Sequence, residues 1–99
     1  MVARTGTLQV NPERIDDVVR ELRDERIPRY REQSGYKGFT VLADRGSGEV
    51  IGISFWETEA DLEASEQLAA EARQGAAQTG EARAEPARDA FEVVLDDQV

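Results

Sequence analysis

The apolar and polar positions of residues 2–10 alternate with a period of two, which is the pattern of a β-strand. One side of this strand would carry Val2, Arg4, Gly6, Leu8 and Val10. The spacing then changes, because Asn11-Pro12 is typical of a helix start. The apolar residues that follow share one helical stripe, namely Ile15, Val18, Val19 and Leu22. Pro28 is expected to interrupt that helix near Ile27.

Residues 37–56 predict a β-hairpin. Two runs rich in Val, Ile, Phe and Thr, residues 37–43 and 50–56, flank a Gly-rich connection at residues 44–49. A turn centred on Gly46-Ser47 would place on one face the pairs Leu42–Ile51, Thr40–Ile53 and Gly38–Phe55. The opposite face would carry the pairs Val41–Gly52, Phe39–Ser54 and Lys37–Trp56.

A second helix is predicted directly after the hairpin. Thr58 followed by Asp61 is a capping box, so the helix is expected from about Glu59 to the mid-seventies. Its inner stripe would be Leu62, Ser65, Ala69, Ala72 and Ala76, and its exposed face Glu59, Glu63, Glu66 and Glu71. Gly80 is a helix stop. Residues 81–87 are expected to form a loop, and residues 90–95 the last strand.

The order β-α-β-β-α-β predicts a single α+β domain over residues 1–99 with a ferredoxin-like fold. Both helices would then cover one face of a four-stranded antiparallel sheet. The strand at residues 50–56 is apolar on both sides, so one apolar face would stay uncovered, which is typical of an association surface. We therefore expect a two-fold homodimer formed through the face that carries Leu42, Ile51, Ile53 and Phe55.

The composition excludes some classes of partner and some kinds of catalytic group. The 12 basic and 21 acidic residues give a net charge of −9, which disfavours nucleic acids and anionic membranes as partners. The chain has no Cys and no His, so the commonest metal ligands and the commonest general base are missing, and we expect no metal and no cofactor. The sequence offers no apolar run of membrane-spanning length and no signal-peptide segment, so we expect a cytoplasmic location.

Three stretches resemble the antibiotic biosynthesis monooxygenase superfamily: the first strand, the NPERIDD helix start and the segment GFTVLADRGSGEVIGISFWETEADLEASE, in which FWET is the most specific part. The resemblance implies a dimeric α+β barrel. It also implies a range of activities: some members are cofactor-independent oxygenases of aromatic polyketides, some degrade haem, and many have no assigned reaction.

The resemblance also suggests which residues to compare. In the haem degraders an Asn on the first strand, a Trp at the end of the third strand and a His on the second helix carry the chemistry. Trp56 matches the Trp, but the first-strand position falls near Thr5, and the second helix contains no His. The resemblance therefore argues against haem degradation.

The residues themselves suggest a pocket between the sheet and the helices. Small side chains at Gly52 and Ser54 beside the large Trp56 can leave a hollow, which Phe39 and Val41 would help to line. Polar residues available to orient a ligand are Arg4, Tyr30, Tyr36 and Lys37. The alternative is that Trp56 simply fills the core. No residue pair identifies a catalytic acid or base.

Two functions remain open on this basis. The first is a cofactor-independent monooxygenase that acts on a small aromatic, polyketide-like metabolite. The second is a non-catalytic dimeric module that binds a small ligand or has a structural role. Haem binding is weaker than either, because the chain offers neither His nor Cys as an iron ligand.

Overall fold

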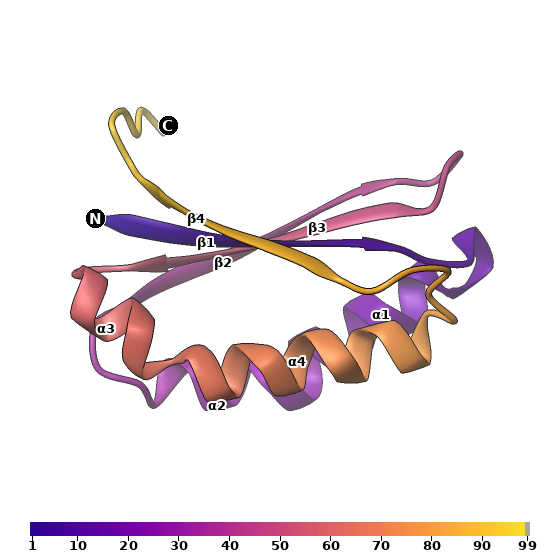
Figure 1. Ribbon diagram of the computed structural model, residues 1–99, viewed down its shortest axis with the longest axis horizontal. Helices are drawn as coiled ribbons and strands as arrows, with labels where there is room; N and C mark the ends of the chain where they lie inside the picture. Colours follow the sequence, from indigo (N-terminus) through magenta and orange to yellow (C-terminus); the bar gives the residue numbers. More distant parts are fainter. Residues whose placement is uncertain (99) are drawn as a thin grey trace.

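The computed structural model describes residues 1–98 and has the predicted ferredoxin-like order of elements. Strands β1 (Val2–Gln9), β2 (Tyr36–Asp44), β3 (Glu49–Trp56) and β4 (Ala87–Glu92) form one antiparallel sheet in the order β2-β3-β1-β4. The helices all lie against one face of this sheet, and the sheet does not close on itself (Figure 1). The other face is left open, as the sequence predicts.

The first helical segment is divided into four short pieces: η1 (Pro12–Arg14), α1 (Ile15–Glu21), a π-helical turn η2 (Leu22–Arg26) and α2 (Ile27–Arg31). The side chain of Asn11 accepts a hydrogen bond from the Glu13 backbone N–H, which makes it the predicted cap. Pro28 lies in the first turn of α2, where its missing N–H costs least. The predicted interruption near Ile27 is thus confirmed.

The second helical segment is longer than predicted and is broken in the middle into α3 (Glu59–Ala64) and α4 (Glu66–Thr79). The Thr58 side chain accepts the Asp61 backbone N–H at 3.1 Å, which confirms Thr58 as the N-cap of the predicted helix. The break falls at the buried Ser65, whose hydroxyl donates to the Leu62 carbonyl at 2.7 Å. Such a local side-chain bond competes with the helical ladder. Gly80 caps the end of α4 as expected.

The predicted hairpin register is confirmed for residues 38–42, including the pairs Val41–Gly52 and Phe39–Ser54. The predicted pair Lys37–Trp56 is wrong, because the register shifts between Tyr36 and Gly38 and Trp56 is paired with Tyr36. One extra residue on β2 at this point turns the Tyr36 side chain to the helix-covered face, where it contacts Tyr30 and Trp56.

The last strand lies three residues earlier than predicted. The apolar run at residues 93–95 suggested a strand at 90–95, yet β4 ends at Glu92, and the side chains of Val94 and Leu95 are 85% and 83% exposed. Strand β4 is held by backbone pairing to β1, from Val2–Glu92 to Thr7–Ala87, and every one of its residues is exposed. Hydrophobicity is therefore a poor guide to its position.

The core lies between the sheet and the helices. It contains mainly residues from β1, β3 and the inner faces of the helices, with Val10, Ile15, Val18 and Trp56 fully buried. On the open face, Ile51, Ile53 and Phe55 are partly buried by their neighbours, and Leu42 and Phe91 are about half exposed. No helix within residues 1–98 is both long enough and apolar enough to span a membrane.

Candidate functional site

A hollow lies between the sheet and helix α4, and small residues on both sides create it. Gly6 of β1 pairs directly with Gly52 of β3, so two adjacent strands present no side chain to the helix layer at this point. Opposite them, α4 presents the methyl groups of Ala69, Ala72 and Ala76 and the longer side chain of Arg73. About 40 Å³ of the hollow is open to the centre of a water molecule. That is room for roughly three waters.

Most of the walls of the hollow are apolar, and four residues add polar groups. Leu8, Leu22, Phe39 and Val50 supply hydrocarbon, while Arg4, Tyr30, Ser54 and Arg73 supply polar groups. The aliphatic part of Arg73 passes over the floor, since a Cβ placed on Gly6 would lie 3.4 Å from its Cδ. Among residues 1–98, those that line the hollow include no Asp and no Glu.

Five of the nine residues selected from the sequence line this hollow: Arg4, Tyr30, Phe39, Gly52 and Ser54. Trp56, Val41 and Tyr36 lie beside it. Trp56 is fully buried; its ring packs against Tyr30 at 6.0 Å and Tyr36 at 5.7 Å, and its Nε1 donates to Ser54 Oγ at 2.9 Å. Trp56 therefore supports the walls through Ser54 and Tyr30. Lys37 is exposed and pairs with Glu57.

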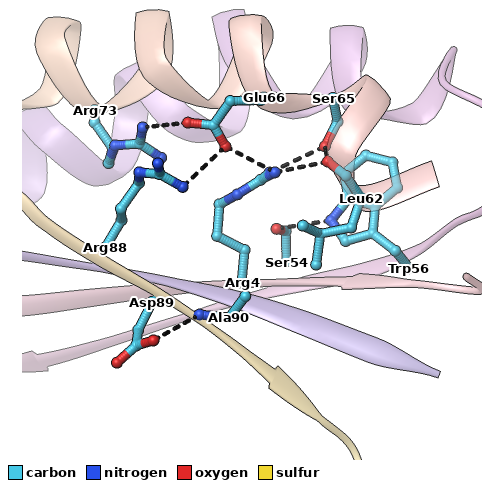
Figure 2. Close-up of polar contacts among 10 residues, drawn as sticks. All are labelled: Arg4, Ser54, Trp56, Leu62, Ser65, Glu66, Arg73, Arg88, Asp89 and Ala90. Atoms are coloured by element: carbon cyan, nitrogen blue, oxygen red, sulfur yellow. Dashed lines mark hydrogen bonds and ion pairs between the residues drawn. The ribbon is translucent and has the colours of Figure 1, made fainter. Parts of the chain in front are cut away.

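Arg4 is the buried cation of the site. Its side chain is only 4% exposed, although it rises from the sheet into the helix layer (Figure 2). The guanidinium donates to Ser65 Oγ at 3.0 Å and to the Leu62 carbonyl at 2.6 Å, and its Nη2 lies 3.0 Å from Glu66 Oε2. Arg4 thus binds the break between α3 and α4 to strand β1.

The carboxylate of Glu66 forms ion pairs with three arginines, which come from β1, α4 and β4. Besides Arg4, Arg73 approaches at 3.0 Å and Arg88 of β4 at 3.5 Å (Figure 2). The sequence placed Glu66 on the exposed helix face with Glu59, Glu63 and Glu71. Those three are exposed, whereas Glu66 is half-buried, with a side chain 38% exposed, and lies at the centre of this ion cluster. Partial burial acts to raise the pKa of Glu66, but the Arg73 hydrogen bond and the three positive charges outweigh it and lower the pKa.

Two donors of this cluster remain without partners. Arg4 Nε and Arg73 Nη1 are buried, and neither makes a hydrogen bond within residues 1–98. Burial lowers the pKa of Arg4 from its ordinary value, and the charge of Glu66 opposes that change. Burial also raises the pKa of Tyr30, although the charges of Arg4 and Arg73 act against the rise, so this phenol stays protonated at neutral pH.

A wider groove shares Arg4 with the hollow. It runs between α3 and strands β1 and β4, and Val2, Leu62, Glu66, Arg88 and Phe91 are among the residues along it. Measured in the same way as the hollow, its volume is about 530 Å³. Arg4 therefore lies between a wide groove and a smaller, largely apolar hollow.

Comparison with known proteins gives the same fold and a family. The family model described as antibiotic biosynthesis monooxygenase matches residues 1–78. Among curated proteins, an uncharacterised Mycobacterium tuberculosis protein, Rv2558, is 36% identical over 75 residues, which covers 76% of this chain and 32% of the relative. A second uncharacterised protein of that organism, Rv2557, is 37% identical over 65 residues, which covers 66% of this chain and 29% of the relative. The chain spans about a third of the length of these relatives.

Solved structures with low sequence identity share the architecture. The Streptomyces coelicolor monooxygenase ActVA-Orf6, in complex with nanaomycin D, has a TM-score of 0.75 at 17% identity and covers 97% of this chain and 92% of its own. The haem degrader MhuD of Mycobacterium tuberculosis, with two haems bound in its active site, has a TM-score of 0.70 at 19% identity. The match covers 99% of this chain and 100% of MhuD. Since the family model accounts for most of the chain and the fold agrees with it, the protein belongs to the antibiotic biosynthesis monooxygenase family.

Proposed function

We propose that this protein is a cofactor-independent monooxygenase that acts on a small aromatic metabolite. The observation that carries the proposal is the hollow on the helix-covered face, which is apolar apart from Arg4, Arg73, Tyr30 and Ser54 at its walls. Membership of the family supports the reaction class. The ActVA-Orf6 monooxygenase, of similar fold, was solved with nanaomycin D, which supports an aromatic ligand.

The reaction balances without an external reductant if the substrate supplies the electrons. An aromatic ketone with a CH₂ conjugated to its carbonyl through the ring, as in anthrone, loses a proton from the CH₂ to give an enolate. The enolate transfers an electron to O₂ and then combines with the reduced oxygen at the carbon of the former CH₂. Loss of water leaves a carbonyl in place of the CH₂. Of the two oxygen atoms, one is retained in the product and the other leaves as water, together with the two hydrogens of the CH₂.

The residues around the hollow have separate parts in this scheme. Arg4 and Arg73 stabilise the negative charge of the enolate, because fixed cations in a site of low polarity act strongly on a developing anion. Tyr30 keeps its proton and donates to an oxygen of the substrate or the reduced dioxygen. The apolar walls hold a flat ring and exclude water.

Haem does not fit this chain. The similarity to MhuD is one of fold. The sequence contains no His and no Cys that could ligate the haem iron. Glu66, at the break between α3 and α4, is already paired with arginines. We therefore base no step of the reaction on haem.

The oligomer is part of the proposal. We infer that two copies pair through the open sheet face, at Leu42, Ile51, Ile53 and Phe55, because these apolar side chains have no helix over them and the helices all occupy the opposite face (Figure 1). Phe91 of β4 extends the same apolar surface.

A binding module is the second candidate, and the lining of the hollow favours it. Among residues 1–98, the lining offers no carboxylate to remove a proton, and the hollow holds only a few waters as it stands. A protein that sequesters a small aromatic ligand needs neither a base nor access for O₂.

Oxygen labelling separates the two candidates. Chelator-treated protein is given anthrone under ¹⁸O₂, and oxygen uptake and the mass of the quinone are followed against the background without protein. Monooxygenation predicts one labelled oxygen per product molecule and a rate that falls in Gly52→Ala, whose new methyl group enters the hollow. The control is Gly46→Ala in the exposed hairpin turn. No uptake above background would favour the binding module.

A further inference from the structure

The sign of the charge around the hollow is opposite to that of the whole molecule. The chain carries a net charge of −9, yet the hollow is lined by Arg4 and Arg73, and no acidic residue among residues 1–98 joins them in the lining. Glu66 is the acid that contacts these arginines, and it is shared with Arg88. Three positive charges therefore meet one negative charge at this end of the hollow.

The hydrogen-bond inventory of the two arginines is also incomplete. The Arg4 side chain is more than nine-tenths buried, and its Nη atoms are bound to Leu62, Ser65 and Glu66, while Nε has no partner within residues 1–98. Arg73 gives Nη2 to Glu66 and leaves Nη1 unpaired in the same way. Buried charged donors without partners are costly, so a native protein normally supplies them with an acceptor.

An anionic oxygen would satisfy both features at once. It would accept hydrogen bonds from guanidinium groups that protein atoms leave free, and it would reduce the excess positive charge. Tyr30, which lines the same hollow and remains protonated, adds a third donor. The apolar remainder of the lining, from Leu8, Leu22, Phe39 and Val50, suits the hydrocarbon part of such a ligand.

We propose that Arg4 and Arg73 form a subsite for an anionic oxygen, so that the site takes planar aromatic acids, as carboxylates or already ionised phenols and enols, in preference to neutral aromatics of the same shape. Because the hollow as it stands has room for about three waters, the side chains that line it must move to admit the ring. This inference deepens the proposed function and rests on it only for the reaction that follows. Because the lining lacks a carboxylate base, the preferred substrate is one that arrives ionised.

The test compares a charged ligand with its neutral isostere. Binding of benzoate and benzamide, and of the bicyclic pair 1-naphthoate and 1-naphthamide, is measured by calorimetry at neutral pH. The acids are expected to bind about tenfold or more tightly than the amides, as for charge-assisted hydrogen bonds. In NMR spectra, the Nε–H signal of Arg4 is expected to shift with the acids and not with the amides.

Two variants locate the effect. Arg73→Met is expected to remove the preference for the acid while leaving the affinity for the amide within about twofold. Arg88→Met removes a charge from the same glutamate but lies outside the hollow, so it is expected to keep the preference. Equal binding of acid and amide by the wild type, no binding of either, or an undiminished preference in Arg73→Met would overturn the subsite.

The binding experiment and the oxygen-labelling experiment test separate claims, so either claim can fail without the other. A preference for the acid without oxygen incorporation supports the subsite and contradicts the monooxygenase. Oxygen incorporation with no preference between acid and amide contradicts the subsite and leaves the monooxygenase standing.

Discussion

Arg4 shows how one side chain links strand β1 to the helix layer. It contacts Ser65, the Leu62 carbonyl and Glu66, all at the junction of α3 and α4. We predict that Arg4→Met lowers the free energy of unfolding by about 1–3 kcal/mol, because charge-assisted hydrogen bonds at a buried site are lost. Urea denaturation measures the change. Arg88→Met serves as the control, since Arg88 is largely exposed and should cost at most about 1 kcal/mol.

If Arg4→Met proved as stable as the wild type, the buried contacts of Arg4 would contribute nothing net. Its role would then be confined to the ligand.

Glu66 makes the stability of the protein depend on pH. Its pKa is lowered in the folded state, so its contribution is complete above the ordinary pKa of a glutamate, near 4.5, and is lost as the pH falls through the lower folded-state value. We predict that the stability difference between the wild type and Glu66→Gln is largest at neutral pH and shrinks below about pH 4. Asp16 and Asp24, whose pKa values are also lowered, are common to both proteins and cancel in this difference.

Urea titrations of both proteins at several pH values measure that difference. A gap that stayed constant from neutral to acidic pH would show that the charge of Glu66 does not support the fold.

The sequence predicts the floor of the site better than it predicts the site's charges. Gly52 and Ser54 could be selected because they share a strand face with the large Trp56, and Phe39 because the predicted register pairs it with Ser54. Glu66 could not, because its neighbours come from β1 and β4, and no local pattern reveals which helical position faces them. The pairing of Gly6 with Gly52 depends on the β1–β3 register, which again is a non-local quantity.

Among the elements, the glycines of the hairpin and the sheet have different roles. Gly48 has a φ of +86°, and a Cβ there would collide with the Val10 carbonyl, whereas a Cβ on Gly52 would meet only the Phe39 ring at 3.4 Å. We predict that Gly48→Ala destabilises the protein by more than about 1 kcal/mol, while Gly52→Ala leaves stability unchanged or raises it by up to about 1 kcal/mol. Thermal or urea unfolding of the two variants measures this directly, and equal losses in both would contradict the assigned roles.

The N-cap residue of α3, Thr58, can be tested for its contribution to stability. Thr58 Oγ1 accepts the Asp61 N–H and donates to the Asp61 carboxylate at 2.9 Å. We predict that Thr58→Ala costs about 1 kcal/mol, the usual effect of losing an N-cap, and that Thr58→Ser restores most of it. Urea denaturation of both variants checks this; a loss of similar size in Thr58→Ser would argue against a capping role.

The elements that sequence predicted well are those with strong local signals. The hairpin, the caps at Asn11 and Thr58 and the interruption near Pro28 each follow from a few adjacent residues. Two of the errors have non-local causes. Strand β4 is placed by hydrogen bonds to β1, and the break at Ser65 involves the distant Arg4. The register shift at Lys37 lies beside Gly38, and a glycine within a strand pattern is the local signal that could have indicated this bulge.

The fold has a division of roles between the two faces of its sheet. The helix-covered face contains the hollow and the arginine cluster, and the open face carries Leu42, Ile51, Ile53 and Phe55. A single copy would leave these side chains in water at about 25 cal/mol for each Å² of apolar surface. Pairing two copies sheet to sheet removes that cost.

The measurement that tests this division most directly is the mass of the particle in solution, determined by sedimentation equilibrium over a range of micromolar concentrations. The wild type is predicted to contain two chains, and Ile53→Lys, which places a charge on the open face, to shift toward one chain. Glu71→Lys, on an exposed helix position, should leave two chains. A wild-type particle of one folded chain throughout the range would contradict the pairing of the open faces.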